Sequence, residues 1–380
     1  MAVRRWEISA VQAAMLMAGV VALTGHALAV SFFIQYGGRD AWMSGIFALP
    51  VSALTIYSLV KLGRMFPGKT IIQYLPKVLG YAGHLVAALF VFYYFMVVVF
   101  TIRMTMDWMV DTILPETPTW VMGLLYMAAV AYLALGGLDV VARANQFLLP
   151  LLSVLGLTVS FGTLQAKDYR LLTPMFEDGL GPVLLASFLG MGVFGEMSVI
   201  GMLNAYVAKK DEKKMLKAHL VGLVYEVITL TGPIAGSIAT LGYRVALDMP
   251  YPTFQHWLMV TLAKFFERTD LLAVHQWLAG AYVRCGLFLL MAVTGLEQLR
   301  NSKKETPSPW RIVVAALAIT LFAERAFPNK LLFDKFVVEI YLPYSAFLGT
   351  FLPPVLLLIA WIRKLGKSGQ AGRAGLSHGS

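Results

Sequence analysis

The sequence predicts an all-α membrane protein with ten transmembrane helices. Three observations support this prediction: the composition, the length of the apolar runs and the distribution of basic residues. Of the 380 residues, 58% are hydrophobic and only 14% are charged, whereas a soluble domain carries about 25% charged residues. The apolar residues occur in runs of about 20, which is the length that a helix needs to cross the hydrocarbon core.

Helices and closed barrels are the two structures that satisfy the backbone within lipid, and unbroken apolar runs exclude a barrel, whose strands alternate. We expect a single transmembrane domain over residues 1–363, with halves at about 8–165 and 182–362, and a disordered tail at 364–380. The first run is too long for a cleavable signal peptide. The expected spans are 8–34, 40–62, 81–109, 119–137, 145–165, 182–207, 216–241, 271–297, 310–327 and 342–362.

The basic residues predict the orientation. With the N-terminus in the cytoplasm, ten spans return the C-terminus there, and most of the 31 Lys and Arg residues fall on the cytoplasmic side, as the positive-inside rule requires. The net charge of +10 is therefore a topology signal. Nucleic-acid binding is not favoured, because the basic residues are spread over short loops. The basic run at 208–219 is interpreted as a loop attracted to anionic lipid, with docking of a partner protein as the alternative.

The stretch GMGVFGEMS at 190–198 has the spacing G-x-G-x-x-G of a dinucleotide-binding loop. It follows half of a membrane span rather than a strand, so the nucleotide interpretation fails on context. Two interpretations remain: small residues that permit close helix packing, or a break in the sixth helix. Glu196 directly follows the last glycine, and an acidic residue at membrane depth points to function, so the break is favoured.

The first span carries a second interruption. Gly19, Thr24, Gly25 and His26 break its apolar run near the middle. The first and sixth spans begin the two five-span halves, and an odd number of spans makes such halves inverted relative to each other. Interrupted spans in corresponding positions predict a transporter-type site at the bilayer midplane. Taken alone, His26 is better explained as a histidine whose ring is satisfied by a neighbouring carbonyl.

Five stretches in order carry a family resemblance: FPGKTIIQYLPKVLG (66–80), LPETPTWV (114–121), DVVARANQFLLP (139–150), FGE (194–196) and FERTDLLAVHQW (266–277). Together they resemble the spore germination receptor B subunits of the GerAB type, over residues 6–363. This family lies within the amino acid/polyamine/organocation transporter superfamily. The resemblance implies a permease-like LeuT-like fold with two inverted five-helix repeats. It also implies a germinant sensor in the inner membrane of bacterial endospores, with a larger A subunit and a lipoprotein C subunit as partners.

In such a fold the ends of the broken helices face the ligand, a small germinant such as an amino acid. Helix N-termini suit its carboxylate, and free carbonyls and a carboxylate suit its ammonium. The apolar wall of the site is expected from Phe194 and from Tyr93 or Tyr94, for which ordinary helix packing is the alternative. The candidate ligand-binding residues are Thr24, Gly25, His26, Tyr93, Gly192, Phe194, Gly195 and Glu196.

Arg284 lies in the middle of the eighth span, too far from either end for its side chain to reach the interface easily. Sodium-coupled members of this fold hold sodium between helices 1 and 8, so the resemblance implies that Arg284 substitutes for the ion. Arg does not deprotonate readily, which leaves Glu196 and Glu226 as candidate proton carriers. Glu226 is equally a candidate structural partner for a buried arginine, and the pairing of Arg103 and Arg284 stays open.

Thr24, His26 and His275 depart from the family's pattern, so L-alanine is not assumed to be the ligand. The alternative function is a proton-coupled, sodium-independent amino acid transporter, which would use the same site. An enzyme is not expected, because the sequence contains no metal-ligand motif, nucleophile–base arrangement or nucleotide loop. For the same reason no cofactor and no metal are expected.

Overall fold

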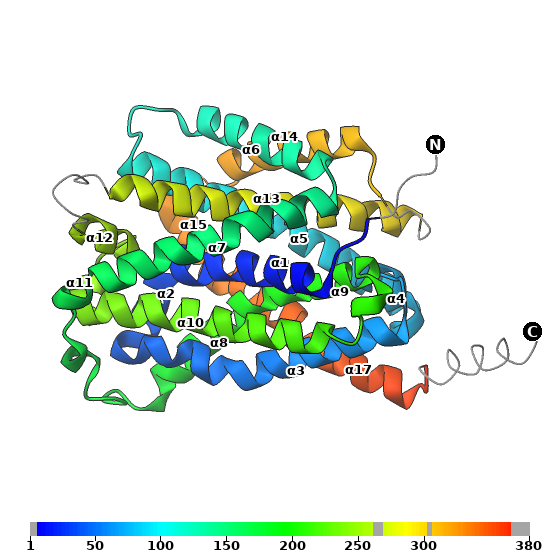
Figure 1. Cartoon of the computed structure of the whole chain (residues 1–380), viewed down its shortest axis with the longest axis horizontal. Coiled ribbons are helices and arrows are strands. Elements are labelled where there is room, and N and C mark those ends of the chain that lie inside the picture. The colour runs from blue at the N-terminus through cyan, green and yellow to red at the C-terminus, as the bar shows by residue number, and fades with distance from the viewer. Residues whose placement is uncertain (1–5, 261–268, 302–305, 328, 366–380) are drawn as a thin grey trace, which may run out of the picture.

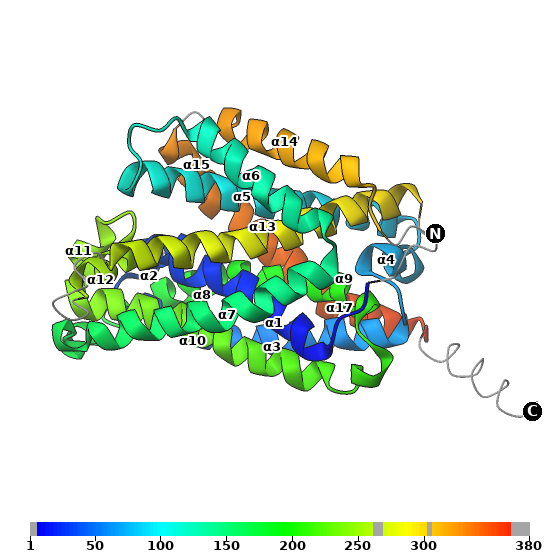
Figure 2. The ribbon, with the colours of Figure 1, turned by 45° about the horizontal axis from the view of Figure 1, so that its top comes forward.

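The computed structural model describes residues 6–260, 269–301, 306–327 and 329–365. Over these residues the chain is an elongated bundle of long helices that run side by side (Figures 1 and 2). Eight helical segments are long and apolar enough to cross a membrane. Two more, α6 and α14, have 17 residues each, about the shortest length that spans the hydrocarbon core. The ten-helix prediction is confirmed; most of the predicted tail, residues 366–380, lies outside the described residues.

Each predicted span corresponds to one helix or to a chain of joined helical segments. The first half contains α1 (Ala10–Leu23), η1 (Thr24–Leu28), α2 (Val30–Gly37), η2 (Gly38–Met43), α3 (Ser44–Met65), α4 (Ile71–Leu79), α5 (Ala82–Thr112), α6 (Thr119–Leu135) and α7 (Leu138–Gly162). The second half contains α8 (Leu180–Phe194), η5 (Gly195–Val199), α9 (Ile200–Leu203), η6 (Asn204–Tyr206), α10 (Met215–Leu241), α11 (Tyr243–Leu247), α12 (Pro252–Met259), α13 (Asp270–Arg300), α14 (Pro309–Arg325), α15 (Lys330–Phe336), η8 (Val337–Tyr341), α16 (Leu342–Ser345), η9 (Ala346–Phe351) and α17 (Leu352–Ile362). Short 3-10 turns at Leu164–Ala166, Tyr169–Leu172 and Lys209–Asp211 lie in the connections.

The last span begins earlier than the sequence predicts. We expected it to start at 342, but the helical segment runs continuously from Lys330. The prediction stopped at the charged residues before 342. These residues are accommodated by i, i+4 pairing on one helix, with Lys330 Nζ 2.9 Å from Asp334 and Lys335 Nζ 3.9 Å from Glu339. Such pairs support a helix, so the charges extend the span rather than end it.

The packing separates central from peripheral helices. Helix α13 packs along α5, α1 packs against both α10 and α7, and α14 packs on α6 at the edge of the bundle (Figure 1). In the most apolar part of α13, 83% of the residues are buried inside the protein, against 17% in α7. Helix α13 is therefore a central element, and α7 presents most of its surface to the outside. Both described chain ends lie at the same end of the bundle.

The two interrupted spans are confirmed, but neither interruption is an unwound stretch. In the first span η1 is a π-helical turn between α1 and α2. In the sixth span η5 is a 3-10 segment between α8 and α9. The Ala29 N–H still donates to the Thr24 carbonyl at 2.9 Å, so the break leaves fewer free N–H groups than expected. An isolated parallel bridge between Ile8 and Val207 ties the start of the first span to the end of the sixth.

Candidate ligand-binding site at the two interrupted helices

A buried ion pair joins the sixth and eighth spans at the centre of the bundle. Arg284, near the middle of α13, donates to Glu196 of η5 through both terminal guanidinium nitrogens, with Nη2 at 2.8 Å from Oε1. Neither side chain is exposed to solvent. This bidentate arrangement is the geometry in which arginine recognises a carboxylate most strongly. This ion pair therefore joins two residues that are 88 positions apart in the sequence.

Glu196 also accepts hydrogen bonds from two further spans. The Thr24 hydroxyl, in the π turn of the first span, lies 3.1 and 3.2 Å from the two carboxylate oxygens. The Tyr341 hydroxyl, in η8 of the last span, donates to Oε1 at 3.1 Å. A buried charge is tolerated when it is paired and its remaining lone pairs accept hydrogen bonds. Glu196 meets both conditions and connects the two interrupted helices directly.

Arg284 is held by partners on two other helices. Its Nε donates to the Thr101 hydroxyl of α5 at 2.6 Å, and Nη1 donates to the Val20 carbonyl of α1 at 2.7 Å. The Thr24 N–H, which a regular α-helix would direct to Val20, donates to Val21 instead. The irregular turn in the first span therefore allows the Val20 carbonyl to receive the guanidinium. Arg284 links the first, third, sixth and eighth spans.

The glycines of the sixth span serve close packing. A Cβ on Gly192 would lie 2.6 Å from the Leu342 carbonyl oxygen, and a Cβ on Gly195 would collide with the Ser345 backbone. The last span therefore approaches the break at a distance that only glycine permits. The two interpretations of the glycine stretch, close packing and a helix break, are therefore compatible. The glycines allow close packing, and the helix changes type at the same place.

Tyr93 lies in the same region, in contact with the last span. Its hydroxyl is 2.5 Å from the Ser345 hydroxyl, which donates to the Gly192 carbonyl at 2.5 Å. The Tyr93 ring stacks on Tyr341 with centroids 6.2 Å apart. Sequence reasoning missed Tyr341 and Ser345, as well as Thr101. The available signal was that Tyr341 and Ser345 flank Pro343 in the last span.

The structure does not bring every predicted residue to this cluster. The His26 Nδ1 lies 2.6 Å from the Ala22 carbonyl of its own helix, which is the alternative that the sequence offered. Gly25 faces α10, where its missing side chain leaves room for Leu230. Phe194 is buried, but its ring does not contact the Tyr93 ring. Within the described part of the chain, the ring contacts of Tyr93 are with Tyr94, Tyr341 and Tyr344. Thr24, Tyr93, Gly192, Gly195 and Glu196 remain as a contiguous set.

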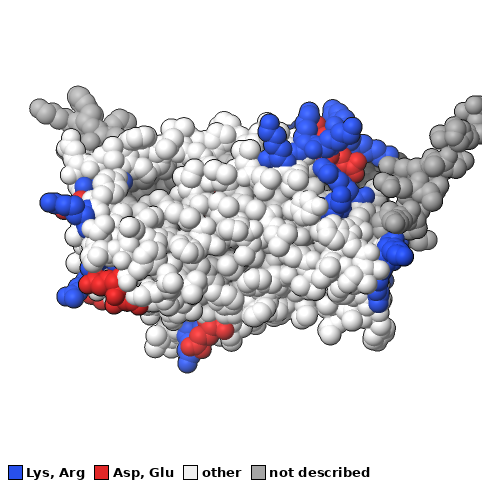
Figure 3. Space-filling view, turned by 90° about the horizontal axis from the view of Figure 1, so that it is seen from below, with Lys and Arg blue, Asp and Glu red and all other residues white. Residues whose placement is uncertain are grey.

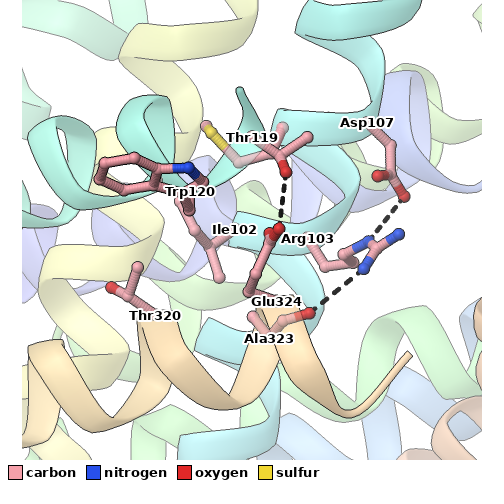
Figure 4. Close-up of a pocket in the computed structure, with 10 residues that line it drawn as sticks. Ile102, Arg103, Asp107, Thr119, Trp120, Thr320, Ala323 and Glu324 are labelled. Atoms are coloured by element: carbon pink, nitrogen blue, oxygen red, sulfur yellow. Dashed lines mark hydrogen bonds and ion pairs between the residues drawn. The ribbon is translucent and has the colours of Figure 1, made fainter. Parts of the chain in front are cut away.

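The second intramembrane arginine belongs to a separate pair. Arg103 Nε donates to Asp107 at 2.9 Å, one turn along α5, and its Nη1 donates to the Ala323 carbonyl at 3.3 Å (Figure 4). Thr119 donates to Glu324 beside it at 2.8 Å. The cavity there measures about 10 Å³, the lower limit for a single water molecule. This pair therefore ties α5 to α14 and has no room for an amino acid.

Glu226 is the exception among the buried acids. It lies on α10, which packs against α1, and it is only 1% exposed. Among the described residues neither carboxylate oxygen has a hydrogen-bond partner. Both buried arginines are paired elsewhere, so Glu226 is not the arginine partner that the sequence allowed. Glu226 lies one helical turn after Gly222, which packs on Met17, and one turn before Leu230, which packs on Gly25. Both of these contacts are with the first span.

Comparison with known proteins identifies the type of chain. The model of the spore germination protein family matches residues 7–328. Spore germination protein XB of Bacillus anthracis is 27% identical, over 93% of this chain and 97% of that protein. Spore germination protein KB of Bacillus subtilis (strain 168) is 22% identical, over 86% and 88%. The crystal structure of MhsT in complex with L-phenylalanine superposes with a TM-score of 0.66 at 13% identity, covering 95% of this chain and 99% of that one. This likeness confirms the LeuT-like fold.

Proposed function

Because the chain belongs to the spore germination protein family, as a membrane subunit of the GerAB type, we propose that it binds a small germinant at the Glu196–Arg284 cluster and signals germination. The ligand would lie between the first, third, sixth and eighth spans. The observation that carries this proposal is the buried network in which Glu196 connects the two interrupted helices. A ligand that enters this network changes contacts on five spans at once: the first, third, sixth, eighth and last.

The charges of the network favour a zwitterion. Glu196 and Arg284 together are neutral, and a buried net charge is costly. A neutral amino acid brings one ammonium and one carboxylate, which complement the two side chains and leave the cluster neutral. A ligand with a net charge would leave that charge unpaired. An α-amino acid with an uncharged side chain is therefore the ligand class that fits, in line with the phenylalanine bound to the structurally similar MhsT.

Ion coupling and partners belong to the same proposal. A guanidinium that donates to the Val20 carbonyl and to Glu196 supplies a fixed positive charge between the first and eighth spans. Ligand binding would then be independent of sodium. Family membership supports an A subunit and a C subunit as partners in the inner membrane of the spore. The distribution of Lys and Arg supports cytoplasmic termini.

Of the two candidate proton carriers, Glu226 is better placed than Glu196. Glu196 is already neutralised by Arg284, whereas the oxygens of Glu226 have no partner among the described residues. A proton or the ammonium of a ligand would supply the missing counter-charge. Because α10 packs against the π turn of the first span, a change at Glu226 would reach the candidate site through that contact.

Thr24→Val tests the site, because it removes one hydroxyl from the Glu196 network and keeps the side-chain shape. The matched control is Thr158→Val on the exposed side of α7, where the hydroxyl donates to the Val154 carbonyl of its own helix at 2.9 Å. The purified chain is heated with neutral amino acids, lysine or glutamate, with and without sodium. We expect a neutral amino acid to raise the melting temperature of the wild type and the control, with no effect of sodium, and a much smaller rise in Thr24→Val.

Two results would contradict the proposal. An equal ligand-induced rise in Thr24→Val and in the wild type would remove the cluster from the site. Counterflow of a labelled amino acid in liposomes that contain only this chain would establish a transporter in place of a sensor.

A further inference from the structure

A groove on the outside of the bundle shares no lining residue with the buried cluster. It forms where the end of α3 meets the first turns of α10, and its volume is about 540 Å³. Sites for small molecules commonly measure about 300–1,000 Å³, so the groove has room for a headgroup and part of a chain. Its lining consists of Arg64, Lys213, Leu216, Lys217, Leu220, Val221 and Val224.

The lining changes in character along α10. Leu216, Leu220 and Val224 are spaced by four residues and share one helix face, as do Lys217 and Val221. The basic side chains lie at the start of α10 and the aliphatic ones follow toward the middle of the span. Val221 and Val224 remain 63% and 53% exposed. The groove is therefore basic at its mouth and apolar along its length.

The basic groups at the mouth are available to a ligand. Arg64 donates to the Glu212 carbonyl at 3.1 Å, which holds its guanidinium beside the loop and leaves other N–H groups free to donate. Within the described part of the chain, Lys213 and Lys217 form no ion pair, whereas the neighbouring Lys214 pairs with Asp211. Figure 3 shows the largest group of basic side chains at one end of a largely uncharged face, with fewer at the opposite end.

We propose that this groove binds an anionic phospholipid. Its phosphate would lie among Arg64, Lys213 and Lys217, and one acyl chain would follow Leu216, Leu220 and Val224. The charge gradient matches that of the lipid, because a phospholipid has its anionic group at one end and hydrocarbon beyond it. Basic pockets between membrane helices at the bilayer surface recognise such headgroups. An acidic protein segment would match the mouth but not the aliphatic strip, which continues into a membrane span.

The test compares two double variants of equal charge. Lys213→Gln with Lys217→Gln removes two groups from the mouth, and Lys209→Gln with Lys210→Gln removes two exposed lysines of the same loop that do not line the groove. Binding of dioleoylphosphatidylglycerol to the purified full chain is titrated by native mass spectrometry and by melting temperature, with dioleoylphosphatidylcholine as the reference lipid. We expect the affinity for phosphatidylglycerol to fall about fivefold per lysine in the first variant and to change little in the second.

The acyl chain is tested separately. Val224→Trp fills the groove, and Ile228→Trp places the same ring one turn further on, at a residue that is 63% exposed and outside the lining. We expect the first to weaken phosphatidylglycerol binding and the second to leave it unchanged. Equal losses in the two lysine variants, binding unaffected by Val224→Trp, or equal stabilisation by inorganic phosphate would each overturn the proposal. Binding unaffected by Val224→Trp, or equal stabilisation by inorganic phosphate, would indicate that the mouth binds an anionic group and that no acyl chain lies in the groove. That anionic group would be a headgroup, free phosphate or an acidic protein segment.

Discussion

Glu196 and Glu226 are both acidic, both buried and both within spans of the second half, yet their surroundings are opposite. Glu196 accepts from Arg284, Thr24 and Tyr341, whereas neither oxygen of Glu226 has a partner among the described residues. The first carboxylate holds the fold together at the place where two helices are interrupted. The second holds nothing in this conformation, so the fold gives no structural reason for its charge. The difference separates a tether from an acidic group without a side-chain partner among the described residues.

Arg284→Ala should have the largest effect on this comparison. It leaves Glu196 buried without a counter-charge and creates a cavity in α13. Loss of one partner of a buried pair costs about 3–5 kcal/mol, so we expect little folded protein. Arg284→Lys should be the mildest change at this position, because an ammonium still reaches a carboxylate or carbonyl. Yield of monodisperse protein and melting temperature measure both. A wild-type melting temperature in Arg284→Ala would show that the pair is not a tether.

Glu196→Gln should come next. The amide still accepts a hydrogen bond, but the Arg284 charge is left uncompensated, so we expect a loss of about 3 kcal/mol, the lower end of the range for breaking a buried pair. The ligand-induced rise in melting temperature should also disappear. Stability and ligand response that match the wild type would contradict both the tether and the proposed site.

Tyr341→Phe removes one hydroxyl donor and leaves the ring stack with Tyr93 in place. A hydrogen bond to a charged group contributes about 1.5–3 kcal/mol, and Arg284 and Thr24 remain bonded to Glu196, so the loss should lie near the lower value. Chemical denaturation of Tyr341→Phe beside Tyr344→Phe, whose hydroxyl donates to the Leu89 carbonyl at 2.9 Å, separates the two tyrosines. A larger loss in Tyr344→Phe would place the stabilising contact outside the cluster.

Glu226→Gln should have the smallest effect on stability. The carboxylate has no hydrogen bond to lose among the described residues, and a neutral amide is less costly to bury than a charge. We expect a change of less than about 1 kcal/mol, in contrast to the same substitution at Glu196. If Glu226 carries a proton or meets a ligand ammonium, the ligand response should change while the melting temperature does not. A stability loss as large as that of Glu196→Gln would give Glu226 a structural partner and end the contrast.

Much of the architecture was predictable because hydropathy is a local property of the chain. The ten spans, the interrupted first and sixth helices and the unusual position of Arg284 all follow from short stretches of sequence. The last span starts earlier than predicted, because i, i+4 pairing accommodates the charged residues between Lys330 and Glu339 within the helix. The five family stretches added the fold, which the similarity to MhsT confirms.

Tertiary structure alone decided which residues meet. Sequence indicated Glu196 and Arg284 as unusual charges, but their pairing depends on two spans presenting these side chains at the same depth, and depth is not encoded in a local pattern. The same reason explains why Tyr341 and Ser345 were missed: a hydroxyl in an apolar helix gains meaning only from the helix packed against it. Conversely, Gly25 packs against α10 and the His26 ring lies against the Ala22 carbonyl of its own helix, so neither residue joins the cluster. Composition along the chain determined the ten helices and the location of the irregular turns; contacts between helices distant in sequence determined that Glu196 is paired and Glu226 is not.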